Sequence, residues 1–154
     1  MFIGHLPAGY LLGKTADVRE RSVWGVVLIC AVLPDFDLIW FYFVDDRTIH
    51  HHRYWVHAPL FWVFLSAAFA PFLWFANRRL LPVLGLALAT LLLHCLLDTI
   101  AGGIMWGWPF SDHLFTLVEV PATYDHFVLS FLLHWTFAAE LLVCLIAYVV
   151  WRQS

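Results

Sequence analysis

The first candidates for chemistry are six ionisable side chains that interrupt long apolar stretches: Asp35, Asp37, His94, Asp98, His134 and Glu140. On insertion scales, an ionisable group inside a membrane span costs at least about 2.5 kcal/mol, so such groups face the interior of a helical bundle and are functional candidates by default. Imidazole and carboxylate ligands together suit zinc, manganese or iron. We therefore expect a divalent-metal site, with zinc ahead of manganese or iron.

Two short spacings sharpen this expectation. His94 and Asp98 are four residues apart, which places them on one helical face where they could bind one ion together, although a buried ion pair explains such a spacing equally well. Asp35 and Asp37 follow Pro34 and would point about 200° apart on a regular helix. Either the proline breaks the helix so that both acids face the site, or one ligates and the other orients a histidine.

A second histidine group, His50 to His52 with Arg53 and then His57, precedes an apolar stretch. Histidines in a loop are often solvated, so we favour His57, which enters the helix, over His50 and His51. Arg53 either is a charged loop residue near lipid headgroups or binds a phosphate oxygen of the substrate through its planar guanidinium group. Glu140 lies too deep for the same cluster and could pair with His5 if the first segment is re-entrant.

The elements that must position these groups are membrane helices. The chain is 63% hydrophobic and only 12% charged, with a mean hydropathy of +0.82, whereas a soluble domain carries about 25% charged residues. A span takes roughly 20 residues, and we place four of them at 23–44, 55–76, 80–101 and 127–151. The sequence thus predicts an all-α polytopic bundle forming one domain, 1–154, with no basic tract for nucleic acid.

Residues 1–13 are apolar but too short to span the membrane. The residues Gly4, Pro7, Gly9 and Gly13 argue against a long regular helix, so we expect a re-entrant or interfacial segment.

The loop charges predict an orientation. One side of the membrane receives six basic residues, Lys14, Arg19, Arg21, Arg78, Arg79 and Arg152, and the other receives two, Arg47 and Arg53. The positive-inside rule places the first side in the cytoplasm. At about 1.5 Å per residue, the depths from the outer span ends are about 10 Å for Asp37, His94 and His134, about 5 Å for Asp98 and about 3 Å for His57, with His126 at the edge. Groups from all four spans therefore share one layer toward the outer face.

These residues resemble the YdjM-like family, which is described as LexA-binding, inner-membrane-associated, metal-dependent hydrolases. The resemblance rests on His5 with Gly9, Pro34-Asp35-Phe36-Asp37, His52-Arg53 with His57, His94 with Asp98, and Gly107-Trp108-Pro109-Phe110-Ser111. The family usually has Thr-His-Ser around the second histidine, whereas this chain has Val56-His57-Ala58 and lacks both hydroxyls. The resemblance implies a location in a bacterial-type inner membrane and, by the family name alone, a protein partner.

The order of the histidines and acids is also similar to the zinc-dependent phospholipase C and P1 nuclease group, an all-helical fold with a multinuclear zinc site. That similarity implies His5, Asp35, His57, His94, Asp98 and His126 as ligands. The group ends with a further His-x-x-x-Glu motif, but position 138, four residues after His134, is alanine. Three metal ions are therefore not implied for this chain.

The function expected from these features is a metal-dependent hydrolase that cleaves an ester or phosphoester of a lipid or lipid-linked substrate near the outer leaflet. A metal would activate water, and Asp35 or Asp37 would serve as general base, with Arg53 binding a phosphate oxygen. Three alternatives remain open: a b-type haem protein, an ion pathway suggested by the broken first span, and a membrane adaptor or regulator.

Overall fold

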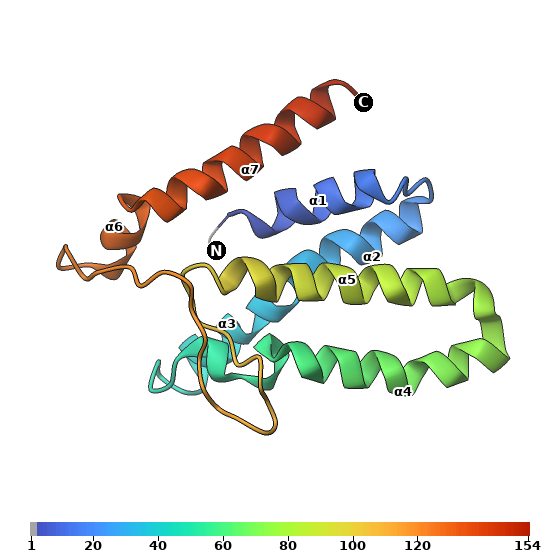
Figure 1. The fold of residues 1–154 in the computed structure, drawn as a ribbon, viewed down its shortest axis with the longest axis horizontal. Helices are drawn as coiled ribbons and strands as arrows, with labels where there is room; N and C mark the ends of the chain where they lie inside the picture. The colour runs from blue at the N-terminus through green and yellow to red at the C-terminus, as the bar shows by residue number, and fades with distance from the viewer. Residues whose placement is uncertain (1–2) are drawn as a thin grey trace.

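The computed structural model describes residues 3–154, and its regular elements are helices (Figure 1). The α-helices are α1 (His5–Thr15), α2 (Arg21–Val32), α3 (Asp37–Phe43), α4 (Pro59–Asn77), α5 (Leu81–Asp98), α6 (Phe127–Leu132) and α7 (Trp135–Arg152). Short 3-10 helices are η1 (Pro34–Phe36), η2 (His51–Arg53), η3 (Trp55–His57) and η4 (Arg78–Leu80). Within the described residues, β pairing amounts to one bridge between Ile104 and Phe115. The expectation of an all-α fold is confirmed.

Two helical segments are long and apolar enough to cross a membrane, Pro59–Asp98 and Trp135–Arg152. The first comprises α4, η4 and α5, and Figure 1 shows that it folds back at η4, so that α4 and α5 run side by side in opposite directions. A third span results if α2 and the bent segment Pro34–Phe43 are counted as one. The expected number of four spans is therefore not confirmed, although the chain has the apolar helices of a membrane protein.

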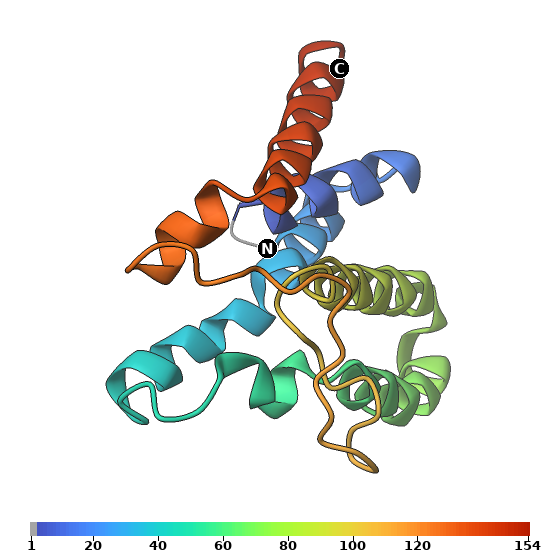
Figure 2. The ribbon, with the colours of Figure 1, turned by 60° about the vertical axis from the view of Figure 1, so that its left-hand side comes forward.

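The segment expected at 23–44 is bent by 55° between α2 and the helices that follow. Pro34 begins the 3-10 turn η1 between them, because proline cannot donate the backbone hydrogen bond that a continuous helix needs at this point. Figure 2 shows α3 projecting away from the bundle beyond this turn. The bend gives Asp35 and Asp37, which flank Phe36, a local geometry that a straight helix would not provide.

The N-terminal segment is short, as expected, but it is a regular helix. Its helix, α1, has 11 residues and packs against α2, α5 and α7. The glycines that argued against a helix permit this packing: a Cβ on Gly9 would lie 2.5 Å from the Ala31 Cβ, and one on Gly13 would lie 2.5 Å from the Trp24 ring. Close contact with α2 outweighs the helix-propensity cost of glycine, which is about 1 kcal/mol per residue.

The span expected at 127–151 is also interrupted. It consists of α6, which has six residues, and α7, with a break at Leu133 and His134. His134 is the N-cap of α7, and its Nδ1 accepts a hydrogen bond from the Thr136 backbone N–H at 3.4 Å. His134, which was expected in the site layer, is therefore the residue that caps the start of α7.

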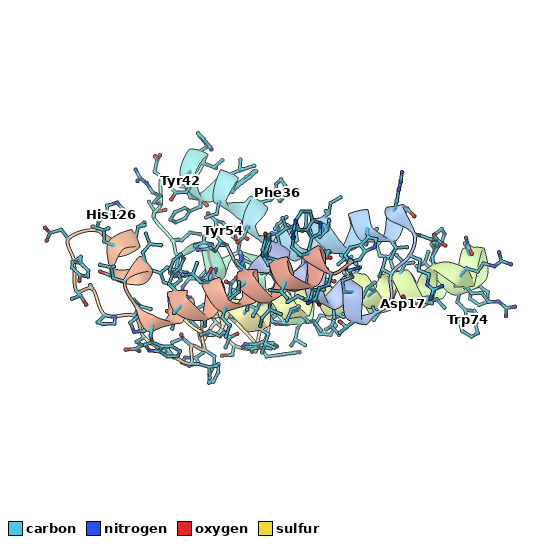
Figure 3. All side chains as sticks on the ribbon, turned by 90° about the horizontal axis from the view of Figure 1, so that it is seen from above. Asp17, Phe36, Tyr42, Tyr54, Trp74 and His126 are labelled. Carbon is cyan, nitrogen blue, oxygen red and sulfur yellow. The ribbon has the colours of Figure 1, made fainter. Side chains whose placement is uncertain are left out.

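The two ends of the molecule differ in chemistry. The six basic residues named above lie at one end, at the end of α1, the start of α2, the α4–α5 turn and the end of α7 (Figure 1). The start of α1, the end of α5, the connection between α3 and α4, and the long connection 99–126 lie at the other. Figure 3 shows Asp17 and Trp74 toward the basic end and His126 toward the opposite one. The histidines and acids that follow belong to this second end.

Candidate metal centre

Asp98, the last residue of α5, is 1% exposed and is surrounded by imidazoles. Its Oδ1 lies 3.0 Å from His5 Nε2, and its Oδ2 lies 3.1 Å from His94 Nε2. The same Oδ2 lies 3.6 Å from His52 Nε2 and 3.7 Å from His57 Nε2. His5 also stacks on His94 with ring centroids 3.8 Å apart. Four histidines from three separate parts of the chain thus converge on one buried carboxylate.

Three of these imidazoles are fixed through their other ring nitrogen. The Nδ1 partners are the Asp37 Oδ2 at 2.7 Å for His57, the Ala31 carbonyl at 2.8 Å for His94, and the Gly102 and Gly103 carbonyls at 2.8 and 3.0 Å for His52. A carbonyl only accepts, so Nδ1 of His52 and of His94 donates. The Nε2 atoms, which face the centre, are then available as ligands, and outer hydrogen bonds of this kind orient metal-binding histidines in proteins.

The histidine Nε2 atoms lie close to carboxylate oxygens and to each other, and these contacts require a positive charge between the atoms. His94 Nε2 lies 3.4 Å from His57 Nε2 and 3.7 Å from Asp35 Oδ1. Neutral imidazoles with Nδ1 protonated would direct lone pairs at the Asp98 carboxylate and at one another, which is unfavourable in a buried site. Either protons or a metal ion must occupy this space, and a divalent ion would satisfy several of these atoms at once.

Two groups within the described residues could each hold a metal ion. The first is His5, Asp35, His94 and Asp98, and the second is His51, His52 and His57, with the ligand atoms of each group within 4.8 Å of one another. Most of these side chains are buried, but the Asp35 side chain is 30% exposed and that of His51 is 26% exposed. The centre is therefore open to its surroundings on the side of Asp35 and His51.

The local sequence explains how these groups are held. Asp35 lies in η1, where Pro34 breaks the helix, and Asp37 begins α3 and holds His57. Asp35 therefore faces the centre, and Asp37 orients a histidine from outside it. This geometry agrees with the second of the two alternatives that the sequence left open for this acid pair.

His52 depends on a close approach to the chain after α5. A Cβ on Gly102 would lie 2.3 Å from His52 Cε1, so the ring can reach the Gly102 carbonyl only because residue 102 has no side chain. Sequence reasoning gave no role to His52, because it lies in a connection without helical periodicity. Its one signal was the pair His52-Arg53 in the family resemblance.

Two histidines outside the spanning helices have shifted pKa values with opposite sign. Burial lowers the pKa of His52 to about 3, so its imidazole is neutral at pH 7. Burial alone would also lower the pKa of His57, but contacts with the Asp35 and Asp37 carboxylates outweigh it and raise the pKa to about 9. A cation that binds at His57 therefore replaces a proton, as expected for a metal ligand among acids.

Glu140 of α7 is a buried acid with a different role. It is 1% exposed, and its Oε2 accepts hydrogen bonds from the backbone N–H groups of Ile3 at 2.8 Å and Gly4 at 3.2 Å. Gly4 is the N-cap of α1 and has no side chain to cap the helix itself. Glu140 therefore reaches the segment of His5, as considered from the sequence, but it does so through the backbone that precedes the histidine.

Of the residues expected in the site, the structure brings together His5, Asp35, Asp37, His57, His94 and Asp98. It places Arg53 on the surface in η2, directly after His52. His126 is exposed at the N-terminus of α6, where its Nδ1 accepts from the Val128 N–H at 3.3 Å, and it belongs to neither group (Figure 3). His126 therefore serves as a helix cap in this fold, which the order of residues in the chain could not reveal.

The fold and the site define a helical membrane protein with a buried histidine and aspartate cluster that could hold a metal ion. The chain belongs to the YdjM inner membrane protein family, whose family model matches residues 1–154. This match confirms the resemblance inferred from the motifs, whereas the similarity to the phospholipase C and P1 nuclease group is not shown. No curated protein and no solved structure was found to match the chain.

Proposed function

We propose that this protein is a multi-pass membrane hydrolase that uses a divalent metal to cleave a lipid or lipid-linked ester or phosphoester near the outer leaflet. The observation that supports it most is the orientation of three buried imidazoles, whose Nδ1 atoms are fixed outward and whose Nε2 atoms converge on Asp98. Such preorganisation of ligands and their outer partners is typical of metal centres.

The donor set fits a borderline divalent cation. Three carboxylates and four imidazoles meet in a largely buried space, and an ion compensates the buried negative charge without a lysine or arginine. Zinc suits this mixture best, with manganese and iron as the next candidates. The acids also make the haem alternative less favourable, because carboxylates suit such cations better than a porphyrin iron.

The exposure and the contacts of each side chain determine its role in the proposed reaction. When bound, the ion would lower the pKa of a water and polarise the scissile group. Asp35 is the general base in this proposal, because its side chain is the most exposed of the three acids and its Oδ1 lies 3.8 Å from His57 Nε2. Asp37 holds the His57 ring in place. Arg53 is exposed in η2, and its planar guanidinium group can donate hydrogen bonds to a phosphate oxygen.

The surroundings of the opening favour an amphipathic substrate. Phe36, Ile39 and Phe43 are exposed along η1 and α3, immediately after Asp35. Acyl or isoprenoid chains can lie against such side chains while a polar head reaches the acids. The basic end of the molecule faces the cytoplasm in this proposal, by the positive-inside rule, so the centre lies toward the outer leaflet of the inner membrane.

The test is elemental analysis of the detergent-purified protein, followed by a screen of phospholipid and isoprenoid phosphate substrates. We expect a stoichiometric divalent metal and hydrolysis of a member of one substrate class, both lost in His94→Ala. Folded wild-type protein that stays metal-free after incubation with zinc, manganese and iron would overturn the proposal.

The alternative functions have their own signatures. A Soret band would favour haem, and ion flux in proteoliposomes that Asp35→Asn abolishes would favour an ion pathway. Full cellular activity in a metal-dead variant would favour the adaptor role that the family name implies.

A further inference from the structure

The second histidine group lies beside the first and is large enough to be a site of its own. His51 and His52 come from η2 and His57 comes from η3, all within the connection between α3 and α4. The ring centroids of His51 and His52 are 4.0 Å apart, and those of His52 and His57 are 4.6 Å apart. The first group comes from α1, η1 and α5. The two groups are thus contributed by different parts of the chain.

The number of donors exceeds what one ion of this kind uses. The two groups contain five histidines and two aspartates, each with one ligand atom available. Zinc takes about four ligands in protein sites, and catalytic sites use about three protein ligands with water. Within each group, one of four residues and one of three, all ligand atoms lie within 4.8 Å of one another, and we infer that the centre binds two divalent ions, one in each group.

An unsatisfied pair of atoms supports the second ion specifically. Asp37 Oδ1 and His51 Nδ1 are both buried, and neither has a hydrogen-bond partner within the described part of the chain. They lie 3.7 Å apart, which is longer than a hydrogen bond. A buried polar atom that is left without a hydrogen bond costs about 1 to 3 kcal/mol in stability. A cation at His51, His52 and His57 compensates the Asp37 charge and gives His51 Nδ1 an electrophilic neighbour.

Asp98 lies where a shared carboxylate is needed. Its Oδ1 contacts His5, and its Oδ2 approaches His94 of the first group and His52 and His57 of the second, at 3.1, 3.6 and 3.7 Å. A carboxylate between two cations lowers their mutual repulsion. We therefore assign Asp98 as the residue that links the two ions.

Two ions also narrow the class of substrate, an inference that rests on the proposed hydrolase function. Two-metal sites stabilise both the attacking and the leaving oxygen of an in-line displacement at phosphorus. The second ion therefore favours a phosphoester over a carboxylic ester. In the reaction, the oxygen of a water forms the new P–O bond, the leaving alcohol oxygen takes the electron pair of the bond that breaks, and Asp35 accepts the proton of the water.

The test is the metal content of the full-length protein in detergent, after loading with zinc and removal of unbound ions. We expect two zinc ions per chain in the wild type, one in His52→Ala and two in the matched control His113→Ala, since His113 is exposed in the 99–126 connection. One ion per chain in the wild type, whichever residues hold it, overturns the second site and leaves the proposed function intact. No ion at all overturns both.

A second variant covers the case in which His52→Ala does not fold. Gly102→Ala retains every histidine but puts a Cβ where the His52 ring lies. It should lose one ion of two while its helical circular dichroism stays like that of the wild type. Manganese-loaded protein adds a spectroscopic readout: the wild type should give the resonance of a spin-coupled pair, and Gly102→Ala should give that of a single ion. Two coupled ions in a folded Gly102→Ala variant would contradict the assignment of His52.

Discussion

The end of α5 and the N-terminal half of α7 each contain an acid that is 1% exposed, yet the two acids have different surroundings. Asp98 faces the Nε2 atoms of His5, His52, His57 and His94. Glu140 faces the backbone N–H groups of Ile3 and Gly4. A backbone N–H can only donate, so it satisfies Glu140 without any further ion. The imidazoles around Asp98 are themselves potential acceptors at Nε2, so this region needs protons or a metal ion between these atoms.

The difference shows that burial of an acid does not by itself define its role. The atoms opposite the carboxylate decide whether it caps a helix or binds a metal. The two regions are also connected, because Glu140 holds the backbone just before His5, and His5 contacts Asp98. The following changes separate the two roles, and their expected effects run from the largest to the smallest.

The largest effect is expected from removing an imidazole of the first group. His94→Ala should weaken metal binding by more than about 100-fold, because loss of an outer partner alone typically costs 10 to 100-fold. Leu96→Ala, on the same helix with an exposed side chain, is the matched control and should bind metal like the wild type. Competition with a chelator measures both affinities. Equal affinity in the two variants would show that α5 contributes no ligand.

A smaller loss is expected when the His57 orienting group is removed. Asp37→Ala leaves every imidazole in place but deletes the acceptor of His57 Nδ1, so metal affinity should fall by about 10 to 100-fold. Asp37→Asn should recover part of this loss, because the amide oxygen still accepts the hydrogen bond. The same titration measures both variants. An Asp37→Asn protein no better than Asp37→Ala would mean that Asp37 acts through its charge and not through the ring orientation.

In the other region, the change should appear in stability more than in metal binding. Glu140→Ala leaves the N–H groups of Ile3 and Gly4, the second of them buried, without this acceptor, at a cost of about 1 to 3 kcal/mol in the free energy of unfolding. Glu140→Gln retains an acceptor oxygen and should restore most of it. Thermal unfolding in detergent, followed by circular dichroism, measures the difference. If Glu140→Ala lost all metal at unchanged stability, Glu140 would belong to the centre.

The smallest effect is expected from the histidine that caps α6. His126→Ala removes an N-cap acceptor at an exposed position, which costs about 0.5 to 2 kcal/mol in helix stability. Metal content and hydrolysis should not change. A loss of bound metal in this variant would restore His126 to the ligand set that the chain order implied.

The residues that the sequence predicted correctly as neighbours are those with a short-range signal. The spacing of His94 and Asp98 places both on one helical face, and Pro34 marks the break that gives Asp35 and Asp37 their geometry. The apolar composition identifies the class of fold. These features depend on residues close together in the chain, so a pattern in the sequence is enough to reveal them.

The features that were missed depend on contacts between distant residues. The helix α1 forms because Gly9 and Gly13 allow close packing on α2, and His52 joins the centre because Gly102 leaves it room. The break before α7 depends on the capping contact of His134 with Thr136. None of these has a periodicity or a motif within one segment, which explains why the count of four spans is not confirmed and why His126 lies outside both groups.

The most direct measurement is a zinc titration of three purified proteins, the wild type, Asp98→Ala and Glu140→Gln, with their helicity checked in parallel. We expect tight, stoichiometric binding by the wild type and Glu140→Gln and none by folded Asp98→Ala. A folded wild type that takes up no zinc, or an Asp98→Ala protein that binds as tightly as the wild type, would contradict the claim that the imidazoles around Asp98 form a metal centre.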